Sequence, residues 1–74
     1  MPMTHPDFGD KQLELRCENR EVCIYATEVG LRKLIALCGT LLDRPQIGHI
    51  HLEDHDLLTN GSLKGTVAIF TTTK

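Results

Sequence analysis

Apolar and polar residues alternate along two neighbouring segments near the start of the chain. In residues 12–18, Leu13, Leu15 and Cys17 fall on one side of an extended chain and polar residues fall on the other. Residues 22–26, VCIYA, alternate in the same way and are rich in β-branched and aromatic side chains. Because only the polar stretch ENRE separates the two segments, the pattern predicts two strands joined in a hairpin.

A change of period after Thr27 predicts a helix. Apolar residues now recur at spacings of three and four, which places them on one helical face. Thr27 is suited to start the helix because its hydroxyl can accept a hydrogen bond from a free backbone N–H, and Pro45 is expected to end it. Gly39 would weaken the helix, and we expect it to allow a close approach to the sheet or to mark fraying. The apolar stripe consists of Leu31, Leu34, Ile35, Cys38, Leu41 and Leu42.

Alternation returns in the second half of the chain. In the stretch HIHLE, Ile50 and Leu52 point to one side of a predicted strand. The polar residues His49, His51 and Glu53 point to the other side. A turn follows at TNGS, because asparagine and glycine favour turns. The last apolar stretch, TVAIF, is predicted to form a strand that is more central than HIHLE, since both of its faces are apolar.

These elements occur in the order β-β-α-β-β, which predicts an α+β fold. We expect a small two-layer sandwich in which one helix packs on an antiparallel or mixed sheet. A chain of 74 residues has room for one such domain and buries roughly 60% of the surface that its unfolded form exposes. Residues 1–10 contain two prolines and a glycine with little periodicity, so we expect a flexible N-terminal arm before a single domain over residues 11–74.

Composition and charge narrow the choice of partner and compartment. The net charge is −2, the eight Lys and Arg residues are scattered and only three residues are aromatic, so we expect no nucleic-acid partner. No apolar run approaches the roughly 18 residues of a membrane span, and the N-terminus lacks the basic start and apolar core of a secretory signal. Three cysteines without a CxxC pair suggest reduced thiols, mostly small buried side chains, in a cytoplasmic protein.

The densest chemistry lies in residues 48–56, GHIHLEDHD, which hold three histidines and three carboxylates. His49 and His51 would project together from one strand face, roughly 6.5 to 7 Å apart. A divalent metal could bridge them, with Glu53 or His55 as a further ligand. The same row faces away from the apolar side of the strand, where polar residues are expected in any case. A solvated strand face, a protein-binding surface and a metal site formed by His49, His51 and Glu53 therefore all stay open.

We predict that this chain is not an enzyme and needs no cofactor. A chain this short has little room for a deep, multi-walled cleft. In HIHLEDH two residues separate the second histidine from the aspartate, whereas the metallo-β-lactamase pattern, His-x-His-x-Asp-His, has one. Ser62 lies in a turn that does not resemble a nucleophile elbow. Cys23 alone among the cysteines alternates outward, which leaves a reactive thiol open as an alternative.

Residues 48–70 resemble the immunity protein 32 family of bacterial polymorphic toxin systems. The likeness rests on a His-x-His-Leu strand, an acidic turn, a Leu-Leu-Thr-x-Gly-Ser loop and a closing apolar strand, and it covers about a third of the chain. The resemblance implies a small cytoplasmic protein that binds and neutralises a cognate toxin domain. His55 and the step Leu63-Lys64-Gly65 depart from the family's pattern. The residues carried over are His49, His51, Leu52, Leu58, Gly61 and Ser62.

A protein is therefore the expected partner. Glu53, Asp54 and Asp56 would form a compact acidic patch that can steer association with a basic toxin domain, such as the active-site face of a nuclease. Two alternatives stay open: a small protein that binds a divalent metal, and a homodimer that pairs through an exposed sheet edge or the apolar last strand. The candidate partner-binding residues are His49, His51, Glu53, Asp54, His55, Asp56, Gly61 and Ser62.

Overall fold

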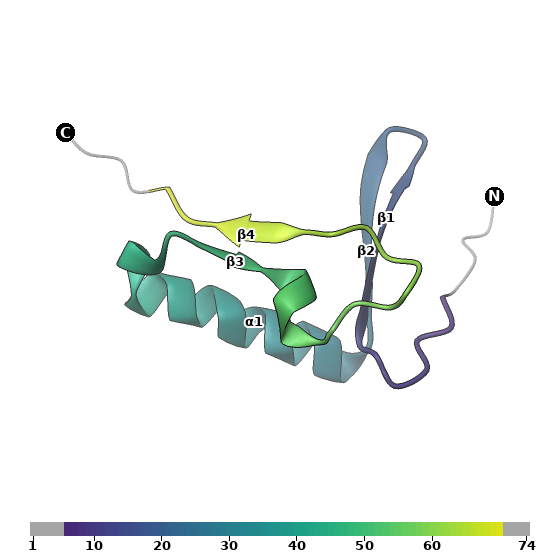
Figure 1. Ribbon diagram of the computed structural model, residues 1–74, viewed down its shortest axis with the longest axis horizontal. Helices are drawn as coiled ribbons and strands as arrows, with labels where there is room; N and C mark the ends of the chain where they lie inside the picture. Colours follow the sequence, from purple (N-terminus) through teal and green to yellow (C-terminus); the bar gives the residue numbers. More distant parts are fainter. Residues whose placement is uncertain (1–5, 71–74) are drawn as a thin grey trace.

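A computed structural model describes residues 6–70 of the chain (Figure 1). Residues 1–5 of the expected N-terminal arm and residues 71–74 of the expected domain lie outside the described residues. The α+β class and the order β-β-α-β-β are confirmed, with two short 3₁₀ helices added. The elements are β1 (Leu13–Glu18), β2 (Glu21–Ala26), α1 (Glu28–Asp43), η1 (Pro45–Ile47), β3 (His49–His51), η2 (Leu52–His55) and β4 (Thr66–Ala68).

The strands form two antiparallel pairs, β1–β2 and β3–β4. The helix α1 runs alongside β3 and β4, and the β1–β2 hairpin stands at one end of the helix (Figure 1). One isolated parallel bridge, between Leu13 and Leu58, connects the two parts. The prediction that the last strand is more central than the histidine strand is wrong, because β3 and β4 pair only with each other. In a two-stranded sheet each strand has one unpaired edge, so neither β3 nor β4 is central within residues 6–70.

The hairpin has one apolar face and one polar face. Asn19 and Arg20 form its turn with φ of 52° and 65°, the left-handed conformation that tight two-residue hairpin turns require. On the polar face, the Arg16 guanidinium lies 4.8 Å from the centre of the Tyr25 ring, and the Tyr25 hydroxyl donates to Glu18 at 3.1 Å. The strand register places Leu13, Leu15, Cys17, Val22, Ile24 and Ala26 on the other face.

The core is small, and its residues come from β1, α1, β3, η2 and the segment that follows η2. Leu13 is fully buried, and Leu57 and Leu41 are only 2% and 3% exposed. Burying one such side chain contributes about 1.5–3 kcal/mol. The buried apolar residues are Leu13, Leu15, Leu41, Ile50, Leu52 and Leu57.

The helix begins and ends where the sequence predicts, but its apolar stripe is mostly uncovered. The Thr27 hydroxyl accepts a hydrogen bond from the Gly30 backbone N–H at 3.0 Å, and Pro45 starts the 3₁₀ helix that follows. Of the six stripe residues only Leu41 is buried, whereas Ile35 and Leu42 are 69% and 71% exposed. Two short strands cover only part of the apolar arc. Within residues 6–70 no helix is long and apolar enough to cross a lipid bilayer.

The close approach that we expected at Gly39 occurs at Gly30 instead. A Cβ atom at Gly30 would overlap the backbone carbonyl of Gln12, which also accepts a hydrogen bond from the Thr27 N–H at 3.0 Å. Around Gly39 there is open space, with no atom within 4 Å of a Cβ placed there. Gly30 therefore lets the first turn of α1 pack against the backbone of Gln12, the residue directly before β1.

This difference gives a matched pair of substitutions within one helix. Gly30→Ala should destabilise the protein by about 1–3 kcal/mol, because the overlap is with backbone that cannot rotate away. Gly39→Ala should stabilise it by up to about 1 kcal/mol through helix propensity alone. Urea unfolding followed by circular dichroism measures both. Equal effects of the two substitutions would show that α1 does not pack in this way.

Candidate functional site

His49 and His51 lie side by side on the open face of β3. Both are exposed, and Ile50 between them is buried, as alternation predicts. Their ring centroids are 4.9 Å apart and the rings are nearly perpendicular, at 82°. The Nδ1 atom of His51 is 3.0 Å from the hydroxyl of Thr66, its neighbour on β4. The two rings are therefore held as an outward-facing pair.

Glu53 reaches this pair from a turn and not from the strand. The prediction of a strand through Glu53 is wrong, since β3 ends at His51 and η2 begins at Leu52. The turn still brings a Glu53 carboxylate oxygen to 3.5 Å from His51 Nδ1, and the carboxylate accepts from the Gly65 N–H at 3.3 Å. Hydrogen bonds from its own backbone and from Gly65 lower the pKa of Glu53, with smaller contributions from His51 and Lys64. Glu53 therefore keeps its negative charge at neutral pH.

The other acidic and histidine residues of this stretch form no hydrogen bond or ion pair with His49 or His51. Asp54 and His55 are exposed in η2, and His55 lines a pocket of about 230 Å³ against α1. Asp56 adopts φ of 56° and forms an ion pair with Lys11, which lowers the pKa of its carboxyl group. The charge in the expected acidic patch is thus unevenly available. Asp56 forms an ion pair with Lys11, whereas Asp54 forms no ion pair with any of residues 6–70.

We name the exposed surface formed by His49, His51, Glu53 and Asp54 the histidine ridge. Within residues 6–70, no group of three or more His, Cys, Asp or Glu side chains is arranged to hold a metal ion. The ridge offers two imidazoles, which can donate or accept hydrogen bonds, and two carboxylates that accept them. This arrangement suits polar contact with another molecule across an open surface.

The exposure of two of the three cysteines differs from the prediction. All three are free thiols, and Cys17 and Cys38 are exposed although they were expected to be buried. Both lie on apolar surfaces that the fold leaves uncovered, Cys17 on the hairpin and Cys38 on α1. Burial and the neighbouring Glu18 and Glu21 carboxylates raise the pKa of the Cys23 thiol. A raised pKa keeps Cys23 protonated, and the protonated thiol is the less reactive form.

Gly61 and Ser62 belong to a loop that is fastened to β1. The Ser62 hydroxyl accepts from the Leu15 N–H at 2.8 Å and donates to the Leu63 carbonyl at 2.8 Å. The Leu63 N–H then donates to the Leu15 carbonyl at 2.9 Å. In this loop Gly65 is needed for space, because a Cβ atom there would overlap the Leu15 side chain. Ser62 therefore supports the fold and presents little surface for a partner.

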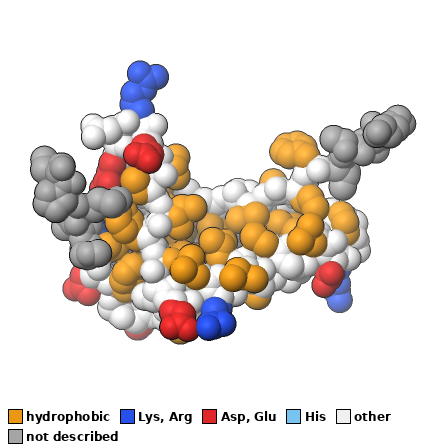
Figure 2. All heavy atoms as spheres, turned by 180° about the vertical axis from the view of Figure 1, so that it is seen from behind, with side chains coloured by type: hydrophobic (Ala, Val, Ile, Leu, Met, Phe, Trp, Pro, Cys, Tyr) orange, Lys and Arg blue, Asp and Glu red, His pale blue; other side chains and the backbone are white. Residues whose placement is uncertain are grey.

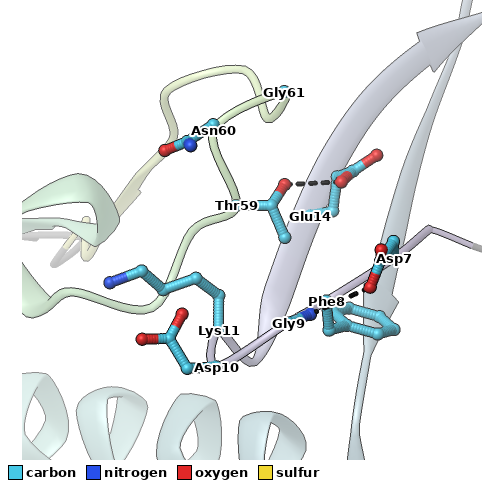
Figure 3. Close-up of a pocket in the computed structure, with 9 residues that line it drawn as sticks. All are labelled: Asp7, Phe8, Gly9, Asp10, Lys11, Glu14, Thr59, Asn60 and Gly61. Atoms are coloured by element: carbon cyan, nitrogen blue, oxygen red, sulfur yellow. Dashed lines mark hydrogen bonds between the residues drawn. The ribbon is translucent and has the colours of Figure 1, made fainter.

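Sequence reasoning missed the contact between Glu14 and Thr59. Glu14 is only 7% exposed, and its two carboxylate oxygens bind the Thr59 hydroxyl and the Arg16 guanidinium. Thr59 and Glu14 point toward each other and line a polar pocket of about 280 Å³ (Figure 3). These hydrogen bonds, first from Thr59 and then from Arg16, lower the pKa of Glu14. Its position on the polar side of β1 gave no signal of this role, because that side was expected to face solvent.

Comparison of the chain with protein-family models, with curated proteins and with solved structures finds no significant match. The resemblance of residues 48–70 to the immunity protein 32 family therefore stays a prediction from the motif. The geometry divides that motif into two parts. Leu52 and Ser62 serve the fold, and His49 and His51 face outward.

The lowered pKa of Glu14 predicts a specific loss of stability in acid. A carboxylate whose folded-state pKa is lowered stabilises the protein above its ordinary value of 4.5, and this contribution is lost as the pH falls through the folded-state value. Glu14→Gln should therefore lower the urea midpoint at neutral pH, and the gap from wild type should narrow as the pH falls below 4.5. Glu21→Gln, at an exposed hairpin position, is the matched control. A gap that is constant with pH would contradict the assignment.

Proposed function

We propose that this chain is a non-enzymatic protein-binding module of the immunity type, which neutralises a toxin domain in the cytoplasm by binding it directly. The observation that carries the proposal is the division of residues 48–65 into a buried half and an outward half. The buried half fixes the position of the segment, and the outward half is the histidine ridge. A surface of this kind is what the motif's resemblance to immunity proteins would require.

The buried half makes the ridge rigid. Leu52 and Leu57, on either side of the acidic turn, are 5% and 2% exposed. The Leu52 N–H donates to the Gly65 carbonyl at 2.8 Å, and the Leu57 carbonyl accepts from the Leu13 N–H at 2.9 Å. Side chains that are already fixed lose less conformational entropy when they bind a partner. This support favours binding without a large rearrangement.

The outward half favours a basic partner. Glu53 is ionised at neutral pH because its pKa is lowered, and Asp54 is exposed beside it. The whole chain has a net charge of −2, so the local and overall charges have the same sign. Negative surfaces raise the association rate with positively charged partners. A toxin domain that acts on nucleic acid has a basic face of this kind, because it must attract phosphates.

The test uses the protein encoded by the gene directly upstream of this one, which the proposal predicts to contain a toxin domain. Cells that express this domain should stop growing and should recover when the present chain is co-expressed. With purified proteins, Asp54→Lys should slow association several-fold at low salt, because it replaces attraction by repulsion at the contact surface.

The matched control is Glu21→Lys, which makes the same charge change on the exposed end of the hairpin. It should leave the association rate close to that of wild type. If the wild-type chain neither protects the cells nor binds the domain, the proposed function is wrong. If both variants slow association equally, the toxin does not contact the histidine ridge.

A further inference from the structure

A second surface, separate from the histidine ridge, carries an inference about self-association. One side of the molecule shows a band of hydrophobic side chains that runs from the hairpin across the helix (Figure 2). No histidine of residues 6–70 is visible on that side (Figure 2), so the band does not include the ridge. We name it the apolar face. Its most exposed members, each at least half exposed, are Val22, Ile24, Leu31, Ile35, Leu42 and Leu63.

The apolar face is continuous and hollowed. A groove of about 390 Å³ runs between the hairpin, α1 and β4, with Ile24 on one wall and Cys38 on another. Cys38 also lines a second groove of about 210 Å³, which continues to Leu42 near the end of α1. Along the helix, Leu31, Ile35, Cys38 and Leu42 are three or four residues apart and therefore neighbours. The two grooves form one surface along most of the molecule.

The residues of the apolar face are of the types that are normally buried in a protein core. The hairpin face that carries Leu13 and Leu15 is covered at its base only, and Val22 farther along it is 70% exposed. An isolated two-stranded hairpin has marginal stability in water. Within residues 6–70 six apolar residues are buried, and a single core in a domain of this size rarely supplies more than about 3–5 kcal/mol. Covering the apolar face would add the missing half of the core.

The area agrees with what a dimer needs. Burial values of about 25 cal/mol per Å² and up to 3 kcal/mol per aliphatic side chain correspond to roughly 100 Å² for a fully exposed side chain. The six residues are between 50% and 71% exposed, so together they expose on the order of 370 Å² of side-chain surface. A standard interface buries about 800 Å² per partner, and in homodimers about 65% of it is apolar. The six side chains therefore supply most of the apolar area of such an interface. A patch of this size on a small protein often has a function.

We propose that the apolar face is the interface of a symmetric homodimer, in which the hairpin of each copy covers the helix stripe of the other. Two features favour a second copy over a different partner. Both acidic and basic side chains lie around the edge of the face (Figure 2), and Glu28 and Arg32 on α1 pair with each other at 2.9 Å, so no single sign of charge selects a charged partner. The hairpin wall and the helix wall are both apolar, so a two-fold rotation that places the hairpin of each copy on the helix of the other brings apolar side chains together at both contacts.

Sedimentation equilibrium of the full chain tests the proposal directly. We expect a mass of twice 8.3 kDa at micromolar concentration. Ile35→Glu places a charge on the apolar face of each copy and should raise the dimer dissociation constant at least about 100-fold, because two unpaired charges would be buried. Val29→Glu makes the same type of change on the opposite side of α1, where Val29 is 49% exposed, and should leave the dimer intact.

Alkylation of Cys38 gives a second readout that needs no variant. In the dimer this thiol is covered, so its reaction with iodoacetamide should speed up on dilution, whereas that of Cys23, which faces the other side of the hairpin, should not.

Several outcomes overturn the proposal: a wild-type monomer at high concentration, a dimer unchanged by Ile35→Glu, or a monomer whose Cys38 is protected only by added lipid vesicles or by the toxin domain. Because Ile35 and Asp54 lie on different surfaces, failure here leaves the proposed toxin binding to its own test.

Discussion

The fold depends on β1 being hydrogen-bonded along both of its edges. On one edge β1 pairs with β2, and on the other the loop of residues 57–63 follows it through backbone bonds to Leu13 and Leu15 and through the Ser62 hydroxyl. Leu13 is at the centre of this arrangement and is completely buried. Without the second set of bonds, the hairpin and the helix–β3–β4 unit would be joined by one short connection only. Ordered presentation of the histidine ridge follows from this link, because the acidic turn leads directly into the fastened loop.

Fastening the loop to β1 also decides which apolar surface remains open. The loop and η2 cover the base of the hairpin, and β3 and β4 cover one side of α1. Nothing in residues 6–70 is left to cover the far half of the hairpin or the other side of the helix stripe, where Ile35 and Leu42 are about 70% exposed. The two proposed interfaces therefore have different physical characters. The histidine ridge is polar and rests on a completed core, and the apolar face is the part of the core that one chain does not complete.

Local sequence signals predicted the elements well. Alternation located β1, β2 and the His49–His51 pair, and Thr27 and Pro45 marked the limits of the helix. Burial was predicted poorly, because periodicity tells which residues share a face and does not tell whether another element covers that face. Leu42 and Cys38 are examples. Contacts between distant segments were also missed. The bond of Glu14 with Thr59 and the tight packing at Gly30 depend on how the loop and the helix meet β1, and no short motif encodes that meeting.

Within residues 48–65 some positions support the fold and others face outward, and this separation affects how the sequence can evolve. Leu52, Ser62 and Gly65 are each constrained by burial, by a backbone hydrogen bond or by lack of space. His49 and Asp54 project outward from the same short segment and carry little of the fold's stability. Substitutions at the outward positions can therefore accumulate while the scaffold stays intact. If the binding partner changes during evolution, a few substitutions at these outward positions can change the binding specificity. The protein keeps its ability to fold throughout.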